Sequence, residues 1–129
     1  MLTYDPEQKP DCESWLAADE SERILAVQHW HKLAKVKLPN QKTHAAFHVI
    51  VENQIAEELD CVCRAIPRLM DQGLSRHDAV HAVMWVLASH MNDLLSDPAA
   101  SQQQGNVHAR YYAQVGRLSA DAWKQQGNP

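Results

Sequence analysis

Residues 75–95 read SRHDAVHAVMWVLASHMNDLL, and this stretch decides the fold class. The apolar side chains from Val80 to Leu87 cover nearly every face of a helix, which predicts a helix buried on most of its sides. Ser75 and Asp78 have the spacing of a capping box, with aspartate in place of the usual glutamate. The sequence therefore predicts a long central helix that begins near Ser75 and is broken by Asp97-Pro98.

The rest of the chain shows helical periodicity and no strand-like alternation between turn residues. We expect further helices over about 11–18, 21–35, 41–59, 61–72 and 107–125. Asn40 and Asp60 are the expected N-caps of the third and fourth helices in the chain, and Pro67 predicts a kink or boundary in the fourth. With a polar arm over 1–12 and a polar connector over 97–106, the sequence predicts an all-α protein. Its expected form is a compact bundle of five to six helices in a single domain.

Composition excludes some classes of function. The 129 residues are 45% hydrophobic and carry a net charge of −4, so a globular core is expected and a basic surface for nucleic acid is not. No apolar run is long enough for a membrane span, and the N-terminus lacks the pattern of a signal peptide. The three cysteines are odd in number and lack the spacing of a disulfide framework, so we expect the protein in the reducing cytoplasm.

Two histidine motifs point to a metal centre. His48 and Glu52 are four residues apart on one predicted helix, and His77 and His81 have the same spacing on another. If the helices over 41–95 run up, down and up, His77 lies beside His48 and His81 beside Glu52. Imidazole and carboxylate in a helical bundle suit one divalent ion of zinc, iron, manganese or nickel. The predicted ligands are His48, Glu52, His77 and His81, with His44 as a further ligand one turn away.

Other interpretations of the same residues remain open. The histidines could form a buried hydrogen-bond network without metal, or could lie unconnected on the surface. The Glu52-Asn53-Gln54 trio could orient imidazoles around a metal or simply bond one helix to another. The cluster His29-Trp30-His31 is expected on a helix surface, since its neighbours point to opposite faces.

The main alternative function is a non-catalytic interaction module that forms a homo-oligomer. Its interface would be sought among the aromatic residues of the outer helices, namely Trp15, Tyr111, Tyr112 and Trp123. An enzyme is neither predicted nor excluded. His77-Asp78-x-x-His81 differs by one methylene from the H-E-x-x-H of zinc peptidases, but Asp78 already has a capping role. No catalytic residue is assigned.

Three stretches together resemble an uncharacterised bacterial family of small helical proteins. They are Leu38-Pro39-Asn40, HAAFHVIVENQIA at 44–56 and GLSRHDAVHAV at 73–83, preceded by Glu22-Arg23 and Trp30-His31. The similarity covers roughly residues 13–125. The resemblance implies a bacterial helical protein that keeps the candidate ligands, and it implies no activity. Members of that family often have glutamate where this chain has Asp78.

Overall fold

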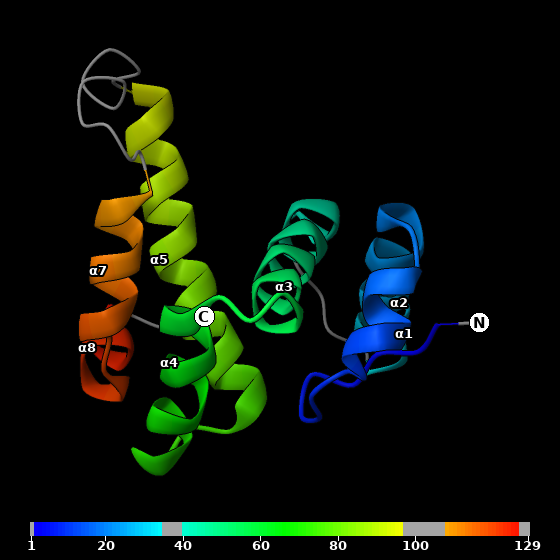
Figure 1. The fold of residues 1–129 in the computed structure, drawn as a ribbon, viewed down its shortest axis with the longest axis horizontal. Coiled ribbons are helices and arrows are strands. Elements are labelled where there is room, and N and C mark those ends of the chain that lie inside the picture. Colours follow the sequence, from blue (N-terminus) through cyan, green and yellow to red (C-terminus); the bar gives the residue numbers. More distant parts are fainter. Residues whose placement is uncertain (1, 35–39, 97–107, 127–129) are drawn as a thin grey trace.

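The structure is a computed structural model that describes residues 2–34, 40–96 and 108–126. This part of the chain contains helices and no strand, as the all-α prediction requires (Figure 1). The helices are α1 (Cys12–Ala17), α2 (Glu20–Leu33), α3 (Gln41–Ala56), α4 (Asp60–Asp71), α5 (Arg76–Ser96), α7 (Ala109–Arg117) and α8 (Ala120–Gln125).

Side-chain caps fix where several helices begin. Asp11, Asp19 and Asn40 accept hydrogen bonds from backbone N–H groups in the first turns of α1, α2 and α3. Ser75 Oγ accepts from the backbone N–H of Asp78 at 3.1 Å, which confirms the predicted start of α5. The cap predicted at Asp60 is wrong, because Asp60 is already helical and Leu59 precedes it without a side-chain bond.

Two other predictions of local structure need correction. Of the kink or boundary predicted at Pro67, the boundary is wrong, because Pro67 lies inside α4 and does not end it. The last predicted helix, over 107–125, is two helices within its described part, because Leu118 adopts an extended backbone and Ser119 caps α8 through the N–H of Ala122. Residues 2–34, 40–96 and 108–126 therefore contain one helix more than the six ranges predicted. The connector predicted over 97–106 lies outside these described residues.

Helix α5 is the centre of the larger core cluster. It packs against α3, α4, α7 and α8, and its buried side chains include Val80, Val83 and Leu87. This burial confirms the prediction made from its nearly continuous apolar surface. None of the helices that the structure describes is both long and apolar enough to cross a membrane.

A second, smaller core cluster joins α1 and α2 to α3, which in Figure 1 lies between this pair and the α4–α5–α7 group. Trp15, Val27 and Val49 are fully buried in this cluster, and Tyr4 from the N-terminal arm joins them. The arm predicted as polar is thus partly internal, since Tyr4 and Pro6 are both buried. Arm, α1 and α2 together cover one side of α3.

The aromatic residues considered for an interface are mostly core residues. Trp15, Tyr111 and Trp123 are 0%, 2% and 3% exposed, and only Tyr112 is half-buried. The apolar surface of these three residues is already buried within the chain, so they do not support an oligomeric interface. The oligomeric state itself stays a prediction.

Candidate metal centre

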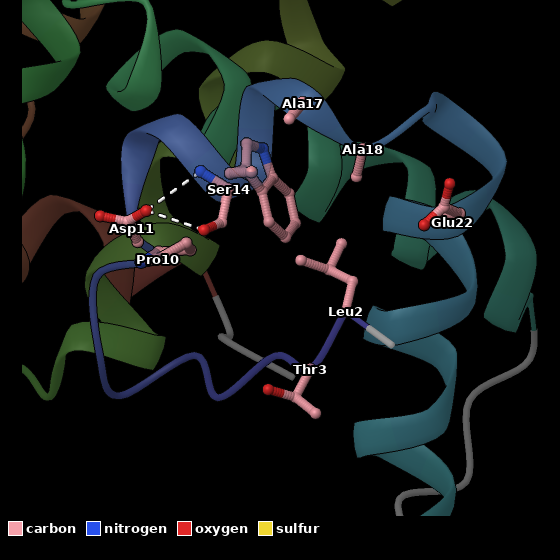
Figure 2. Close-up of a pocket in the computed structure, with 9 residues that line it drawn as sticks. Leu2, Thr3, Pro10, Asp11, Ser14, Ala17, Ala18 and Glu22 are labelled. Atoms are coloured by element: carbon pink, nitrogen blue, oxygen red, sulfur yellow. Dashed lines mark hydrogen bonds between the residues drawn. The ribbon is translucent and has the colours of Figure 1, made fainter.

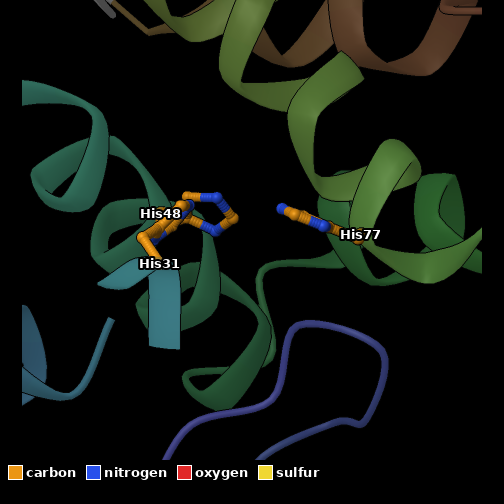
Figure 3. Close-up of side chains that lie close together, drawn as sticks. All are labelled: His31, His48 and His77. Carbon is orange, nitrogen blue, oxygen red and sulfur yellow. The ribbon is translucent and has the colours of Figure 1, made fainter. Parts of the chain in front are cut away.

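Five histidines from three helices meet between the two core clusters. His31 comes from α2, His44 and His48 from α3, and His77 and His81 from α5. The ring centroids of contacting pairs are separated by 4.2 to 6.1 Å. Figure 3 shows His77 reaching from α5 toward His31 and His48. We call these five residues the histidine cluster.

The cluster contains two groups of three side chains that could hold a metal ion. One is His31, His48 and His77, and the other is His44, His48 and His81. Within each group the three candidate ligand nitrogens lie within 4.8 Å of one another. His48 belongs to both groups and is fully buried.

The order in which α3 and α5 pair differs from the predicted one. His44 contacts His81, His48 lies between His77 and His81, and Glu52 pairs with Arg76. Higher residue numbers on α3 meet lower numbers on α5, so the two helices run in opposite directions past the cluster. The predicted parallel arrangement, with His81 beside Glu52, is therefore wrong. The i,i+4 pairs still face each other because each pair remains on one face of its helix.

Glu52 lies outside both three-histidine groups. Its two carboxylate oxygens accept hydrogen bonds from the two terminal nitrogens of the Arg76 guanidinium, each at 2.8 Å. Both side chains are buried, with exposed fractions of 0% for Glu52 and 6% for Arg76. Arg76 also donates to the carbonyl of Pro6 at 2.9 Å, which ties the arm to α5. The carboxylate predicted as a ligand is thus the counter-ion of a buried arginine.

A hydrogen-bond chain connects this ion pair to the cluster. The Tyr4 hydroxyl donates to Glu52 Oε2 at 2.5 Å, and His48 Nδ1 lies 3.2 Å from the same hydroxyl oxygen. Burial, followed by the Glu52 charge, raises the pKa of Tyr4 well above its ordinary value, so the phenol keeps its proton. Because that proton points to Glu52, His48 Nδ1–H donates to the Tyr4 oxygen. The Nε2 atom of His48 then carries a lone pair directed into the cluster.

His31 is oriented in the same way by the backbone. Its Nδ1 lies 2.8 Å from the carbonyl oxygen of Val27, one turn earlier on α2. A carbonyl can only accept, so Nδ1 carries the hydrogen and Nε2 carries the lone pair. Two of the five imidazoles are therefore held in the tautomer that binds a metal through Nε2.

Three ring nitrogens in the cluster have no hydrogen-bond partner. They are the Nε2 atoms of His31, His44 and His77, and each is buried. The remaining two Nε2 atoms, on His48 and His81, lie 3.1 Å from each other. Buried polar atoms without partners are uncommon in folded proteins, so three of them in one cluster require an explanation.

The environment keeps the cluster uncharged at neutral pH. Burial, with added repulsion from neighbouring histidines, lowers the pKa of His44 to about 4 and that of His81 to about 3. Burial is also the main cause that lowers the pKa of His31, His48 and His77. Neutral imidazole is the form that binds metal ions, and no proton has to be displaced at pH 7.

Sequence reasoning missed His31, which was expected on the surface and is only 4% exposed, while its neighbour His29 is exposed. A signal was present, because His31 follows the core residue Val27 by four positions and so lies on the same helix face. Tyr4 and Arg76 were also missed.

Asn53 and Gln54 have structural roles. Asn53 Oδ1 accepts from Trp15 Nε1 at 2.8 Å, and Gln54 Oε1 accepts from the Tyr111 hydroxyl at 2.8 Å. These bonds match the simpler interpretation of the polar trio, in which it joins one helix to another. Only Glu52 reaches toward the histidine cluster, through Tyr4.

A cavity of about 560 Å³ opens beside α1 and the N-terminal arm (Figure 2). Asp11, Ser14 and Glu22 line it together with mainly apolar residues, and no cluster histidine borders it. Asp11 is occupied as a helix cap, accepting from both the backbone N–H and the hydroxyl of Ser14. The side chains of Asp11 and Ser14 are thus engaged in capping α1.

Comparison of the chain with models of known protein families, with curated proteins and with solved structures gives no match. The resemblance to a bacterial helical family and the cytoplasmic location stay predictions.

Proposed function

We propose that this protein binds a divalent transition-metal ion through the Nε2 atoms of the histidine cluster. The observation that supports this most strongly is the set of three buried Nε2 atoms without partners, on His31, His44 and His77. A metal ion in the first group would give the nitrogens of His31 and His77 the electron-pair acceptor that they lack, and an ion in the second group would do so for His44.

The competing explanation is a hydrogen-bond network without metal. The 3.1 Å separation between the Nε2 atoms of His48 and His81 fits such a bond. That network leaves the other three Nε2 atoms unsatisfied, at a cost of about 1–3 kcal/mol each. Since a folded domain is stable by only about 5–15 kcal/mol, this cost weighs against a purely structural cluster.

The same separation fits two ligands on one ion. With Zn–N distances of about 2.0–2.1 Å, two nitrogens at a tetrahedral ion lie about 3.4 Å apart. The observed 3.1 Å between His48 and His81 is close to this value. The other nitrogens, within 4.8 Å of one another in each group, would need to move inward by an ångström or so at most.

The donor set narrows the choice of metal. Imidazole nitrogen suits zinc, iron, nickel and copper, whereas manganese favours carboxylate oxygen. Glu52 is engaged by Arg76, so the cluster offers nitrogen alone and manganese becomes the least suited of the four metals predicted from sequence. Three histidine ligands leave a coordination position open, and a zinc ion held in this way lowers the pKa of a bound water to about 7.

Tyr4, Glu52 and Arg76 would serve as positioning residues for such an ion. Arg76 donates two hydrogen bonds that hold Glu52 in place, Glu52 orients the Tyr4 hydroxyl, and Tyr4 fixes the tautomer of His48. A hydrogen bond of this kind on the outer ring nitrogen makes the inner nitrogen a stronger and better directed ligand.

Isothermal titration of the metal-free protein with zinc at pH 7.5 tests the proposal. The wild-type protein should bind zinc, and His48→Ala should weaken binding by about 100-fold or more because it removes a ligand common to both groups. His29→Ala is the matched control, since His29 is an exposed histidine of α2 outside the cluster. Absence of heat with wild-type protein, or equal effects of the two substitutions, would refute the proposal.

A further inference from the structure

We propose that the histidine cluster holds one metal ion at a time in two alternative positions that share His48. The inner position uses His31, His48 and His77, and the outer position uses His44, His48 and His81. This inference rests on the proposed metal-binding function and adds the number of ions and the way in which the cluster admits them.

The number of ions follows from His48. Both groups of three require this residue, and its Nδ1 is engaged with the Tyr4 hydroxyl. Only Nε2 remains, and a neutral imidazole nitrogen has a single lone pair and binds one ion. The two groups therefore cannot be filled together while the Tyr4 bond persists.

The two positions differ in burial. His48 is common to both and His77 is half-buried like His44 and His81, so the difference rests on His31, which is only 4% exposed. The Trp30 ring also packs against His77 of the inner position, with centroids 5.0 Å apart. Two of the three outer ligands are half-buried, against one of the three inner ligands, so the outer position is the more exposed of the two.

Passage between the positions needs only small displacements. Each ligand of one group has a neighbour in the other, with ring centroids 4.2 Å apart for His77 and His81 and 4.9 Å apart for His31 and His44. The ion would stay bound to His48 while it exchanges two imidazoles for two others. All ligands are uncharged nitrogen donors, so neither position changes the charge or the donor type around the ion.

Cobalt(II) absorption tests this inference, since its visible bands report the ligand geometry around the ion. Titration of the metal-free full-length protein should saturate at one cobalt per chain. His31→Ala removes the inner position and His44→Ala the outer one, so each single variant should still bind cobalt, with spectra that differ from each other. His48→Ala and the double variant His31→Ala/His44→Ala each damage both groups and should lose binding by about 100-fold or more.

Other results would overturn the inference in distinguishable ways. Two cobalt ions bound per wild-type chain would refute the inference that both positions depend on His48. Loss of binding in either single variant, identical spectra in both, or firm binding by the double variant would indicate one undivided site. A wild-type protein that binds no cobalt and no zinc would instead refute the proposed function itself. Circular dichroism of each variant, with His29→Ala as control, separates loss of ligands from loss of fold.

Discussion

Glu52→Gln should destabilise the protein strongly, because it leaves a buried guanidinium without a counter-ion. The Glu52–Arg76 pair has two hydrogen bonds of 2.8 Å, and its side chains are 0% and 6% exposed. Glutamine keeps the shape of the side chain, but one of the two contacts becomes amide nitrogen facing guanidinium nitrogen. Removing one member of a buried ion pair costs about 3–5 kcal/mol. For a chain of this size the free energy of unfolding falls by about 2 kcal/mol per molar urea. A loss of about 4 kcal/mol in this free energy therefore lowers the urea concentration at the unfolding midpoint by about 2 M.

Asp60→Asn is the matched control, because Asp60 and Arg64 form an ion pair in which each side chain is 76% exposed. An exposed i,i+4 pair contributes about 0.3–0.5 kcal/mol, so this midpoint should move by about 0.2 M. Urea unfolding at pH 7.5 with a chelator, followed by circular dichroism, compares the two variants free of metal. In the double variant Glu52→Gln/Arg76→Met the cost should be smaller than the sum of the single ones. Equal midpoint shifts for Glu52→Gln and Asp60→Asn would refute the argument.

Three further predictions concern pH, the arm and two glycines. Burial lowers the pKa of His44 to about 4 and that of His81 to about 3 from 6.5, so below pH 6.5 the unfolded chain binds protons that the folded one excludes. The free energy of unfolding of metal-free protein should therefore be at its full value above pH 6.5 and fall between pH 6.5 and about 3. Equal urea midpoints at pH 7.5 and 5.0 would contradict this. Tyr4→Phe removes the acceptor of His48 Nδ1–H and should weaken zinc binding by about 10-fold or more in calorimetry, so an unchanged affinity would exclude the positioning role. Gly73 has a φ of +106°, whereas Gly116 lies in α7 without that constraint and with nothing within 4 Å of an added Cβ. In thermal unfolding Gly73→Ala should therefore cost about 1 kcal/mol or more and Gly116→Ala should stabilise by up to about 1 kcal/mol, and effects of the same sign would contradict this.

Much of the fold was predictable because its signals are local. The apolar surface around Val83, the Ser75 cap and the Asn40 cap depend only on neighbouring residues, and the structure agrees with each. The break at Ser119 is local as well, but it lies within a stretch that otherwise keeps helical periodicity. A serine N-cap competes with continued helix there, and the extended Leu118 backbone shows which of the two prevails.

The candidate site was predictable only in part, because its completion depends on tertiary contacts. The i,i+4 spacing placed His77 and His81 on one face of their helix, while their contact with His48 was an assumption about packing that the structure bears out. Whether α3 and α5 run in the same or opposite directions depends on how these helices and α4 pack against one another. The opposite directions bring Glu52 next to Arg76. Tyr4 belongs to an arm without helical periodicity, so only the folded chain brings it to His48.

The most direct test is elemental analysis by mass spectrometry of tag-free protein purified without added metal or chelator. The proposed centre predicts close to one zinc, iron, nickel or copper ion per wild-type chain and per His29→Ala chain, and a metal-free His48→Ala variant that remains helical. Wild-type protein that contains no metal, and takes none up when it is offered, would contradict the account and leave the five histidines as structural packing.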